Sequence, residues 1–294
     1  MAIVINTNVN SLIVQRSLNA STNGMATAME RMTTGLRINS AADDAAGLVI
    51  SKGIETQQRG TEMAIKNAQN GINMLQTAEG NLDKIQEHLL AIRDLTLQAM
   101  NGGYSADEVK AMESEVQARQ NEIDRIATGA KFNEFDLFAA GKTKTDGVTY
   151  QIGSGSKAAT NTIEVKGVFH DAQLSTLSGG AAAGIKGAIT FVDSGGAVKD
   201  RSAIATDVLD KIDVAIKDVS SRLGTIGASS IRLNAAVDNL SVQSQNLQAA
   251  NSRIKDADIA QESSNYLNKQ ILQQAGAALL AQANQAPSVA LSLI

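Results

Sequence analysis

One segment of the sequence resembles a phosphate-binding loop. Residues 136–143 read DLFAAGKT, and the Gly-Lys-Thr end is typical of loops whose backbone N–H groups surround phosphates. Such a loop needs a glycine six residues before its lysine, and this chain has Asp136 there, whose charge repels phosphate. We therefore do not expect a nucleotide to bind here.

Other chemistry-bearing residues are also better explained as structural. Residues 153–155 read GSG after a predicted strand, but strand-like residues follow, so they do not form a dinucleotide fingerprint. His88 and His170 are far apart in sequence, and we expect exposed side chains rather than metal ligands. Asp43 and Asp44 precede a predicted helix, where carboxylates cap backbone N–H groups. The sequence predicts no catalytic, metal or cofactor site, and hence no enzyme.

The composition indicates long helices packed through small residues. The chain has 294 residues with one proline, no cysteine, no tryptophan and 3% aromatic residues. Without cysteine there are no disulfides or thiolate ligands, and a net charge of -4 does not favour nucleic acid as a partner. No apolar run is long enough to span a membrane, and the start lacks the basic region of a signal peptide.

Apolar residues recur at alternating steps of three and four, which is the pattern of long packed helices. The longest repeat runs from Leu209 to Ile254, and its polar positions Ser230, Ser244 and Asn251 are interpreted as setting the packing register. Two further repeats precede it. The predicted helices of this bundle are therefore about 45–100, 106–128 and 205–254.

The boundary between the first two of these helices has a clear local signal. Residues 101–103 read NGG, and glycine tolerates the left-handed backbone that ends helices. Ser105 and Glu108 then match a capping box, which begins the next helix. The second helix should therefore fold back against the first.

Both ends of the chain are also predicted to be helical. One helix covers about 10–33, and another begins near Ile259 and ends near Asn284–Pro287, because proline disfavours helix at the residue before it. Between the two ends, residues 141–200 are rich in glycine. Within them VTYQIG and NTIEVKGVF alternate as a pair of strands, and AITFV could hold another short hairpin.

The two ends are apolar and almost without charge. No charged residue precedes Arg16, and none follows Lys269. The large aliphatic residues of the C-terminal segment cannot offset the entropy of ordering it, even when paired with the N-terminal helix. We therefore expect the ends to become ordered against other copies of the chain, through these core assembly contacts: Val9, Leu12, Ile13, Met25, Met29, Met32, Ile271, Leu272, Leu279, Leu280, Leu291, Leu293 and Ile294.

The same segments resemble the bacterial flagellin family. INTNVNSLIVQRSL, ERMTTGLRINSAADDAAGLVIS and RQNEIDRIATGAKFNEFDLF are similar to its N-terminal half, and ANSRIKDADIAQESSNYLNKQILQQAGAALLAQANQ to its C-terminal half. Together the similar stretches cover about 1–140 and 205–294. The resemblance implies a structural subunit of an extracellular flagellar filament.

The resemblance also implies a division of the chain. Residues 1–42 and 256–294 would form an inner helical pair lining a central channel, and residues 43–255 an outer rod domain with a β-hairpin at 148–170. Residues 171–200 leave little room for the large outer domains of many flagellins, so this would be a minimal form.

Several partners are implied by the same resemblance. They are further copies of the chain, an export chaperone, the flagellar type III export apparatus, and hook-junction and filament-cap proteins. A Toll-like receptor of an animal host is another, because Leu95, Gln98, Glu115 and Arg119 match residues that the family uses there, although a basic residue expected nearby is Ala91. The alternatives are a hook–filament junction protein, a helical signalling hairpin and an enzyme.

Overall fold

The described residues of the chain fold into long helices with two small β-hairpins. The computed structural model describes residues 8–138, 146–177, 189–192, 198 and 208–291. Its elements are α1 (Val9–Thr34), α2 (Ala45–Ala99), α3 (Ala106–Gly129), β1 (Lys131–Phe132), β2 (Phe135–Asp136), β3 (Gly147–Gln151), α4 (Ala158–Asn161), β4 (Thr162–Lys166), α5 (Leu174–Leu177), α7 (Asp210–Lys255) and α8 (Ile259–Leu291). This arrangement confirms the predicted mainly helical fold class.

The chain divides into two compact units. One comprises residues 60–243 and the other comprises residues 1–59 together with 244–294. We call the first the middle unit and the second the end unit. Helices α2 and α7 contribute residues to both.

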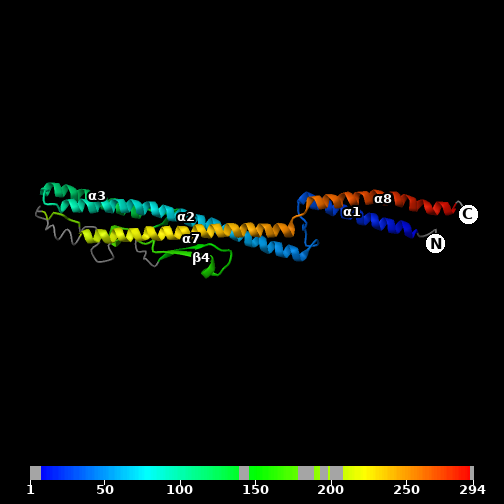
Figure 1. Cartoon of the computed structure of the whole chain (residues 1–294), viewed down its shortest axis with the longest axis horizontal. Helices are drawn as coiled ribbons and strands as arrows, with labels where there is room; N and C mark the ends of the chain where they lie inside the picture. Colours follow the sequence, from blue (N-terminus) through cyan, green and yellow to red (C-terminus); the bar gives the residue numbers. More distant parts are fainter. Residues whose placement is uncertain (1–7, 139–145, 178–188, 193–197, 199–207, 292–294) are drawn as a thin grey trace. The chain divides into compact units, whose positions relative to one another are not determined.

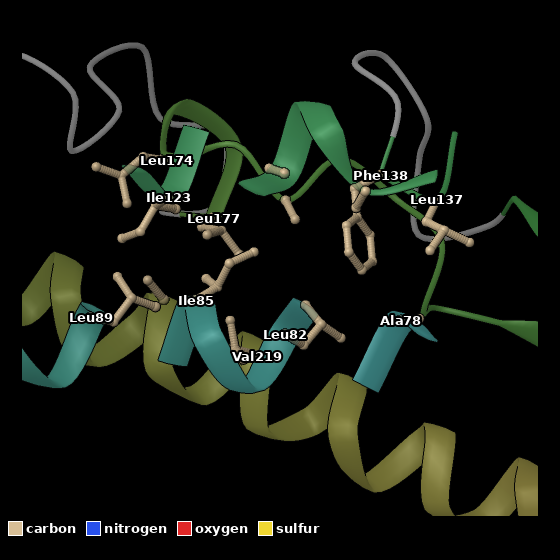
Figure 2. Close-up of a cluster of buried hydrophobic side chains, with 14 of the residues drawn as sticks. Ala78, Leu82, Ile85, Leu89, Ile123, Leu137, Phe138, Leu174, Leu177 and Val219 are labelled. Atoms are coloured by element: carbon tan, nitrogen blue, oxygen red, sulfur yellow. The ribbon is translucent and has the colours of Figure 1, made fainter. Parts of the chain in front are cut away.

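The middle unit is built on a buried row of α2 side chains. Leu75, Ala78, Leu82, Ile85 and Leu89 are fully buried and follow the predicted spacing of three and four. Figure 2 shows four of them facing side chains of α3, α7 and the segments that follow α3. The partners drawn there are Ile123, Leu137, Phe138, Leu174, Leu177 and Val219.

The turn from α2 to α3 contains the predicted capping box. Ser105 Oγ accepts from the N–H of Glu108, and the Glu108 carboxylate accepts from the N–H of Ser105 at 2.7 Å. These bonds satisfy N–H groups at the start of α3 that have no partner within the helix. They also lower the pKa of Glu108, chiefly through the backbone hydrogen bond from Ser105.

Both hairpins are antiparallel. The turn between β1 and β2 is formed by Asn133 and Glu134, whose φ values of 45° and 67° are the sign that two-residue hairpin turns require. The strands predicted within VTYQIG and NTIEVKGVF are β3 and β4. Of the AITFV segment only residues 189–192 are described, and Val192 bridges Val198.

The β3–β4 hairpin packs on α2 through Tyr150. A methyl group at Gly71 would lie 2.9 Å from the Tyr150 ring, so the glycine allows the strand to approach the helix closely. The Tyr150 hydroxyl donates to Met74 Sδ at 3.2 Å, and burial raises the pKa of Tyr150 to about 12.

Arg222 holds the segment after β4 against α7. Its side chain is 2% exposed, and its guanidinium donates to the backbone oxygens of His170 and Asp171, each at 2.9 Å. It also donates from Nε to Asp218 Oδ2 at 2.8 Å. Burial lowers the pKa of Arg222, and the Asp218 carboxylate acts in the opposite direction.

This cluster corrects the expectation that His170 is exposed. The residue is 6% exposed, and its Nε2 lies 3.6 Å from Asp218 Oδ2. The hydrogen bonds from Arg222 hold the backbone of residues 170 and 171 against α7. The His170 imidazole is buried in this position. His88 is only half-buried, on α2.

Carboxylates of α3 hold two further segments. Glu113 Oε2 accepts from the N–H groups of Phe191 and Val192 at 3.1 and 3.2 Å. Asp124 Oδ1 accepts from the N–H of Leu174, the first residue of α5, at 3.0 Å. The segments after β4 are thus bonded to α3 and α7, far from them in sequence.

In the end unit, α1 and α8 form an antiparallel pair (Figure 1). The direction is given by three contacts along the pair: Asn8 with Ala283, Thr22 with Gln273, and Arg31 with Glu262. The Arg31–Glu262 contact is an ion pair at 3.2 Å between partly buried side chains. The two ends of the described chain therefore lie side by side.

The ends of these helices are capped as their sequences allow. Asp44, as predicted, accepts from the N–H of Gly47 at 2.9 Å at the start of α2, and Asp43 accepts from the N–H of Ser40 in the preceding turn. Gly35 ends α1 at a φ of 70°, the left-handed conformation that glycine adopts readily. Asp258 caps α8 by accepting from the N–H of Ala260.

Helix α8 does not end at Asn284–Pro287 as the sequence predicted, but continues to Leu291. Pro287 has no N–H to donate to the carbonyl of Ala283, which lies four residues earlier. That carbonyl accepts instead from Asn8 Nδ2 at 2.7 Å. Because Asn8, the N-cap residue of α1, replaces the missing helical donor, proline costs this helix less than its local preference suggests.

Candidate assembly surface

The facing sides of α1 and α8 are lined by small or flexible residues. Ser21 and Ala28 are buried, and Met25 and Met32 are half-buried on the same face of α1, at steps of four and three. A methyl group at Gly24 would lie 3.1 Å from the Lys269 side chain, so the helices are close there. Leu280 is half-buried on α8. Met25, Met32 and Leu280 therefore contribute to the pairing itself.

The outer sides of the pair carry large apolar side chains in solvent. Val9, Leu12 and Ile13 lie at positions i, i+3 and i+4 of α1, which places them on one face, and they are exposed by 58%, 56% and 50%. Leu272 and Leu279 share a face of α8, exposed by 53% and 59%. We call these five residues, together with Met29 and Ile271, the apolar outer face.

Seven large apolar side chains exposed on two paired helices are unusual for a protein that stays monomeric. Single exposed aliphatic residues are ordinary, but grouped ones mark interaction sites. Helix α8 has no charged residue after Lys269, so no charged group there would have to lose its hydration on burial. The geometry suits a partner that is itself apolar.

The remaining predicted contact residues are at the C-terminus. Leu291 is the last residue of α8, and Leu293 and Ile294 lie outside the described residues. The role of all thirteen residues in assembly stays a prediction.

Sequence reasoning missed part of the exposed apolar surface of this unit. Val49 and Ile50 at the start of α2 are 73% and 56% exposed, although they stand in an apolar run. Ile259 and Leu267 of α8 are also exposed. The consecutive apolar residues Leu48, Val49 and Ile50 were the available signal, because a helix can bury only one side of such a run.

Glu55 joins α2 to α7 within the end unit. Its carboxylate lies 2.8 Å from Lys52 Nζ and 2.9 Å from Lys255 Nζ. The hydrogen bond from Lys52, followed by the one from Lys255, lowers the pKa of Glu55 from 4.5 to about 2.

This shift predicts a pH dependence. A lowered pKa in the folded state stabilises the fold fully above the unfolded value near 4.5, and the contribution disappears as pH falls through about 2. The melting temperatures of the wild type and of Glu55→Gln, measured at low salt from pH 6 downward, should therefore converge as pH falls across this range. Glu79→Gln, an exposed change on the same helix, is the control. A difference that does not shrink would contradict the assignment.

The residues that resembled catalytic or ligand sites have structural surroundings. Asp136 pairs with Lys131 at 3.0 Å, while residues 139–145 of the loop-like segment lie outside the described part. The oxygens of Gly153 and Gly155 accept from Gln151 Nε2. Among the described residues, no group of acidic or histidine side chains could hold a metal ion, and no helix is long and apolar enough to cross a membrane.

The four residues predicted from the sequence as a receptor surface, Leu95, Gln98, Glu115 and Arg119, all lie in the middle unit. Leu95 is partly buried against the core, and Gln98 Nε2 donates to the Tyr104 hydroxyl at 3.0 Å. Glu115 accepts from Arg119 at 2.7 Å along α3. Gln98 and Glu115 are exposed.

Comparison with known proteins gives matches over both halves of the chain. The family model for the bacterial flagellin N-terminal helical region matches residues 5–143, and that for the C-terminal helical region matches residues 209–294. The flagellin of Bacillus subtilis is 38% identical over 307 residues, covering 99% of both chains. The flagellar filament 33 kDa core protein of Treponema phagedenis is 36% identical, again over 99% of each.

A longer relative is also similar over its full length, and one solved structure shares the fold. Polar flagellin A of Vibrio parahaemolyticus is 34% identical over an alignment of 375 residues that covers all of both chains, so it carries insertions that the 294 residues here lack. A solved structure described as a flagellar hook-associated protein of Vibrio parahaemolyticus has a TM-score of 0.62, covering 73% of this chain and 100% of that one. At 17% identity this likeness shows the fold alone.

Proposed function

This chain belongs to the bacterial flagellin family, and we propose that its α1–α8 pair is the part that becomes buried as copies assemble. As a flagellin of minimal length it is a structural subunit of the flagellar filament and not an enzyme. Its family implies self-polymerisation into an extracellular filament. Burial of the α1–α8 pair between copies would supply the free energy for that polymerisation.

The single observation that carries the proposal is the apolar outer face. Burying each of its large side chains contributes about 1.5–3 kcal/mol, which is available only when another molecule covers them. An α1–α8 pair alone leaves that surface in water. We therefore assign residues 1–42 and 256–294 to an inner core lining a channel, and residues 43–255 to the outer part of the subunit.

Further partners are suggested by the family and by the apolar end. The chain would be exported unfolded by the flagellar type III apparatus, with a chaperone covering the C-terminal segment beforehand. Hook-junction and cap proteins would border the assembled subunits. Because the fold can be shared with a hook-associated protein, the full-length similarity to filament proteins is what favours the filament body over the junction.

A host Toll-like receptor is a further proposed partner. The candidate surface is Leu95, Gln98, Glu115 and Arg119, whose polar members are within reach of solvent on α2 and α3. The neighbouring Ala91 supplies no positive charge, so we expect weaker recognition than in flagellins with a basic residue there.

Proteolysis tests the assembly proposal. In purified monomer, a protease should cut first within about 1–40 and 255–294, because these segments cannot bury their apolar residues alone. Seeds or a precipitating salt should then yield long filaments in electron micrographs and protect both ends. Ends that resist cleavage in a monomer that forms no filaments would overturn the proposal.

The Asn8–Ala283 hydrogen bond gives a sharper test of pairing within the filament. Asn8 Oδ1 also accepts from the N–H of Ser11, capping α1. Asn8→Asp keeps that acceptor but loses the donor to Ala283, which should cost about 1 kcal/mol and lower the temperature at which filaments dissociate.

Pro287→Ala should reverse this loss, because alanine restores the helical N–H that bonds the Ala283 carbonyl. The dissociation temperatures of the two single variants are compared with that of the double variant Asn8→Asp/Pro287→Ala. If Pro287→Ala raises the dissociation temperature by the same amount with either residue at position 8, the two groups are not coupled and the explanation for Pro287 is wrong.

A further inference from the structure

The chain contains three asparagine–glycine steps in different surroundings. Asn23-Gly24 lies within α1 and Asn70-Gly71 within α2, whereas Asn101-Gly102 lies in the exposed turn between α2 and α3. The same dipeptide therefore occurs twice in a helix and once outside one.

An asparagine–glycine step can cyclise by an intramolecular reaction. The backbone nitrogen of the glycine attacks Cγ of the asparagine, a new N–Cγ bond forms, and the Cγ–Nδ2 bond breaks as ammonia leaves. Water then opens the five-membered imide at either carbonyl, giving aspartate or isoaspartate. No oxidant or reductant is needed, and glycine hinders the attack least because it has no Cβ.

A helix suppresses this reaction. Inside α1 and α2 the glycine N–H is bonded to the carbonyl four residues earlier, and the asparagine ψ is held near its helical value. The attack requires that bond to break and ψ to rotate. Asn23 and Asn70 can thus react only through local opening of their helices.

The turn at Asn101 imposes no such restraint. Asn101 is exposed. Its backbone N–H donates to the Gln98 oxygen at 3.0 Å, and its side chain takes no part in that bond. In the part of the chain that the structure describes, neither the Asn101 side chain nor the Gly102 N–H makes a hydrogen bond. The nucleophile and the amide are both available, and water has access.

We propose that Asn101 is a site of spontaneous deamidation in the folded protein, with the α2–α3 turn selecting it over the two helical steps. The product places a new carboxylate two residues after the C-terminus of α2, where the helix carbonyls already concentrate negative charge. Asp107 and Glu108 follow at the start of α3. Older subunits would therefore carry a more acidic turn than new ones.

The test is peptide mass spectrometry on the full chain aged in warm, mildly alkaline buffer. Trypsin should release residues 94–110, in which Asn101 is the one asparagine, and residues 67–84, which contain Asn70. Asn101 should convert at least about tenfold faster than Asn70, because a local opening of ~1.4 kcal/mol already slows a reaction by that factor.

Two controls distinguish the effect of the folded turn from the intrinsic reactivity of the asparagine–glycine dipeptide. In the urea-unfolded chain the two rates should become similar, and Gly102→Ala should slow conversion of Asn101 in the folded chain by hindering the attack. Equal rates in the folded chain, or a preference for Asn101 that persists unchanged in urea, would overturn the proposal.

Asn23 reports separately on assembly. If α1 is disordered in the monomer, Asn23 should convert there and be protected in filaments, while Asn101 converts faster than Asn70 in both. Protection of Asn23 in the monomer would count against the assembly proposal without affecting the assignment of Asn101.

Discussion

Arg222→Ala should lower the free energy of unfolding by about 3–5 kcal/mol, a loss typical of removing one member of a buried ion pair. Arg222 is 2% exposed and bonds the carbonyls of His170 and Asp171 as well as the Asp218 carboxylate. Alanine would remove three hydrogen bonds and the charge that Asp218 faces. Urea unfolding followed by circular dichroism measures the change.

Two variants show whether burial and geometry cause the effect. Arg232→Ala, an exposed arginine on the same helix, should change the free energy of unfolding by less than about 0.5 kcal/mol. Arg222→Lys keeps the charge but not the planar group that reaches both carbonyls and Asp218, so it should remain clearly destabilised. A loss below about 1 kcal/mol in Arg222→Ala would mean that the segment is held by other contacts.

Ile271→Asp should prevent filament formation while leaving the monomer folded. Ile271 is 62% exposed in the single chain, so the change costs the monomer little. In the assembly it would forfeit about 1.5–3 kcal/mol of apolar burial and add the cost of burying an unpaired carboxylate. Since 1.4 kcal/mol is tenfold in affinity, the critical concentration should rise by more than about a hundredfold.

Ile271→Val is the matched control, because it keeps a branched apolar side chain at the same place and should still assemble. The measurement is the protein left in the supernatant after seeded assembly and sedimentation, together with the melting temperature of each monomer. Filaments of Ile271→Asp at the wild-type critical concentration would remove Ile271 from the assembly surface.

Features set by near neighbours in sequence could be predicted. The capping box of Ser105 and Glu108 and the cap at Asp44 depend on residues three positions apart, and the rows of buried α2 residues depend on helical periodicity. The β3–β4 pair was visible from its alternating pattern. In each case the physical cause lies within the segment itself.

Features that depend on residues far apart in the sequence could not be predicted. Arg222 and His170 are 52 residues apart, so neither the burial of the histidine nor the place of Arg222 could be read from its own neighbourhood. The helix through Pro287 depends on Asn8, a donor that becomes available only once α1 lies beside α8. The apolar, nearly uncharged character of both ends could be read from the sequence, but which of their residues face inward and which are exposed required the structure.

The pairing of the two chain ends joins residues from opposite ends of the sequence. Asn8 and Ala283 are 275 residues apart, so their bond closes nearly the whole chain into one loop. Residues 60–243, which form the middle unit, are all synthesised before Ala283. A chain that stops short cannot close the α1–α8 pair at all. Closure of this pair therefore needs both ends of the sequence, and a subunit without α8 would leave α1 unpaired.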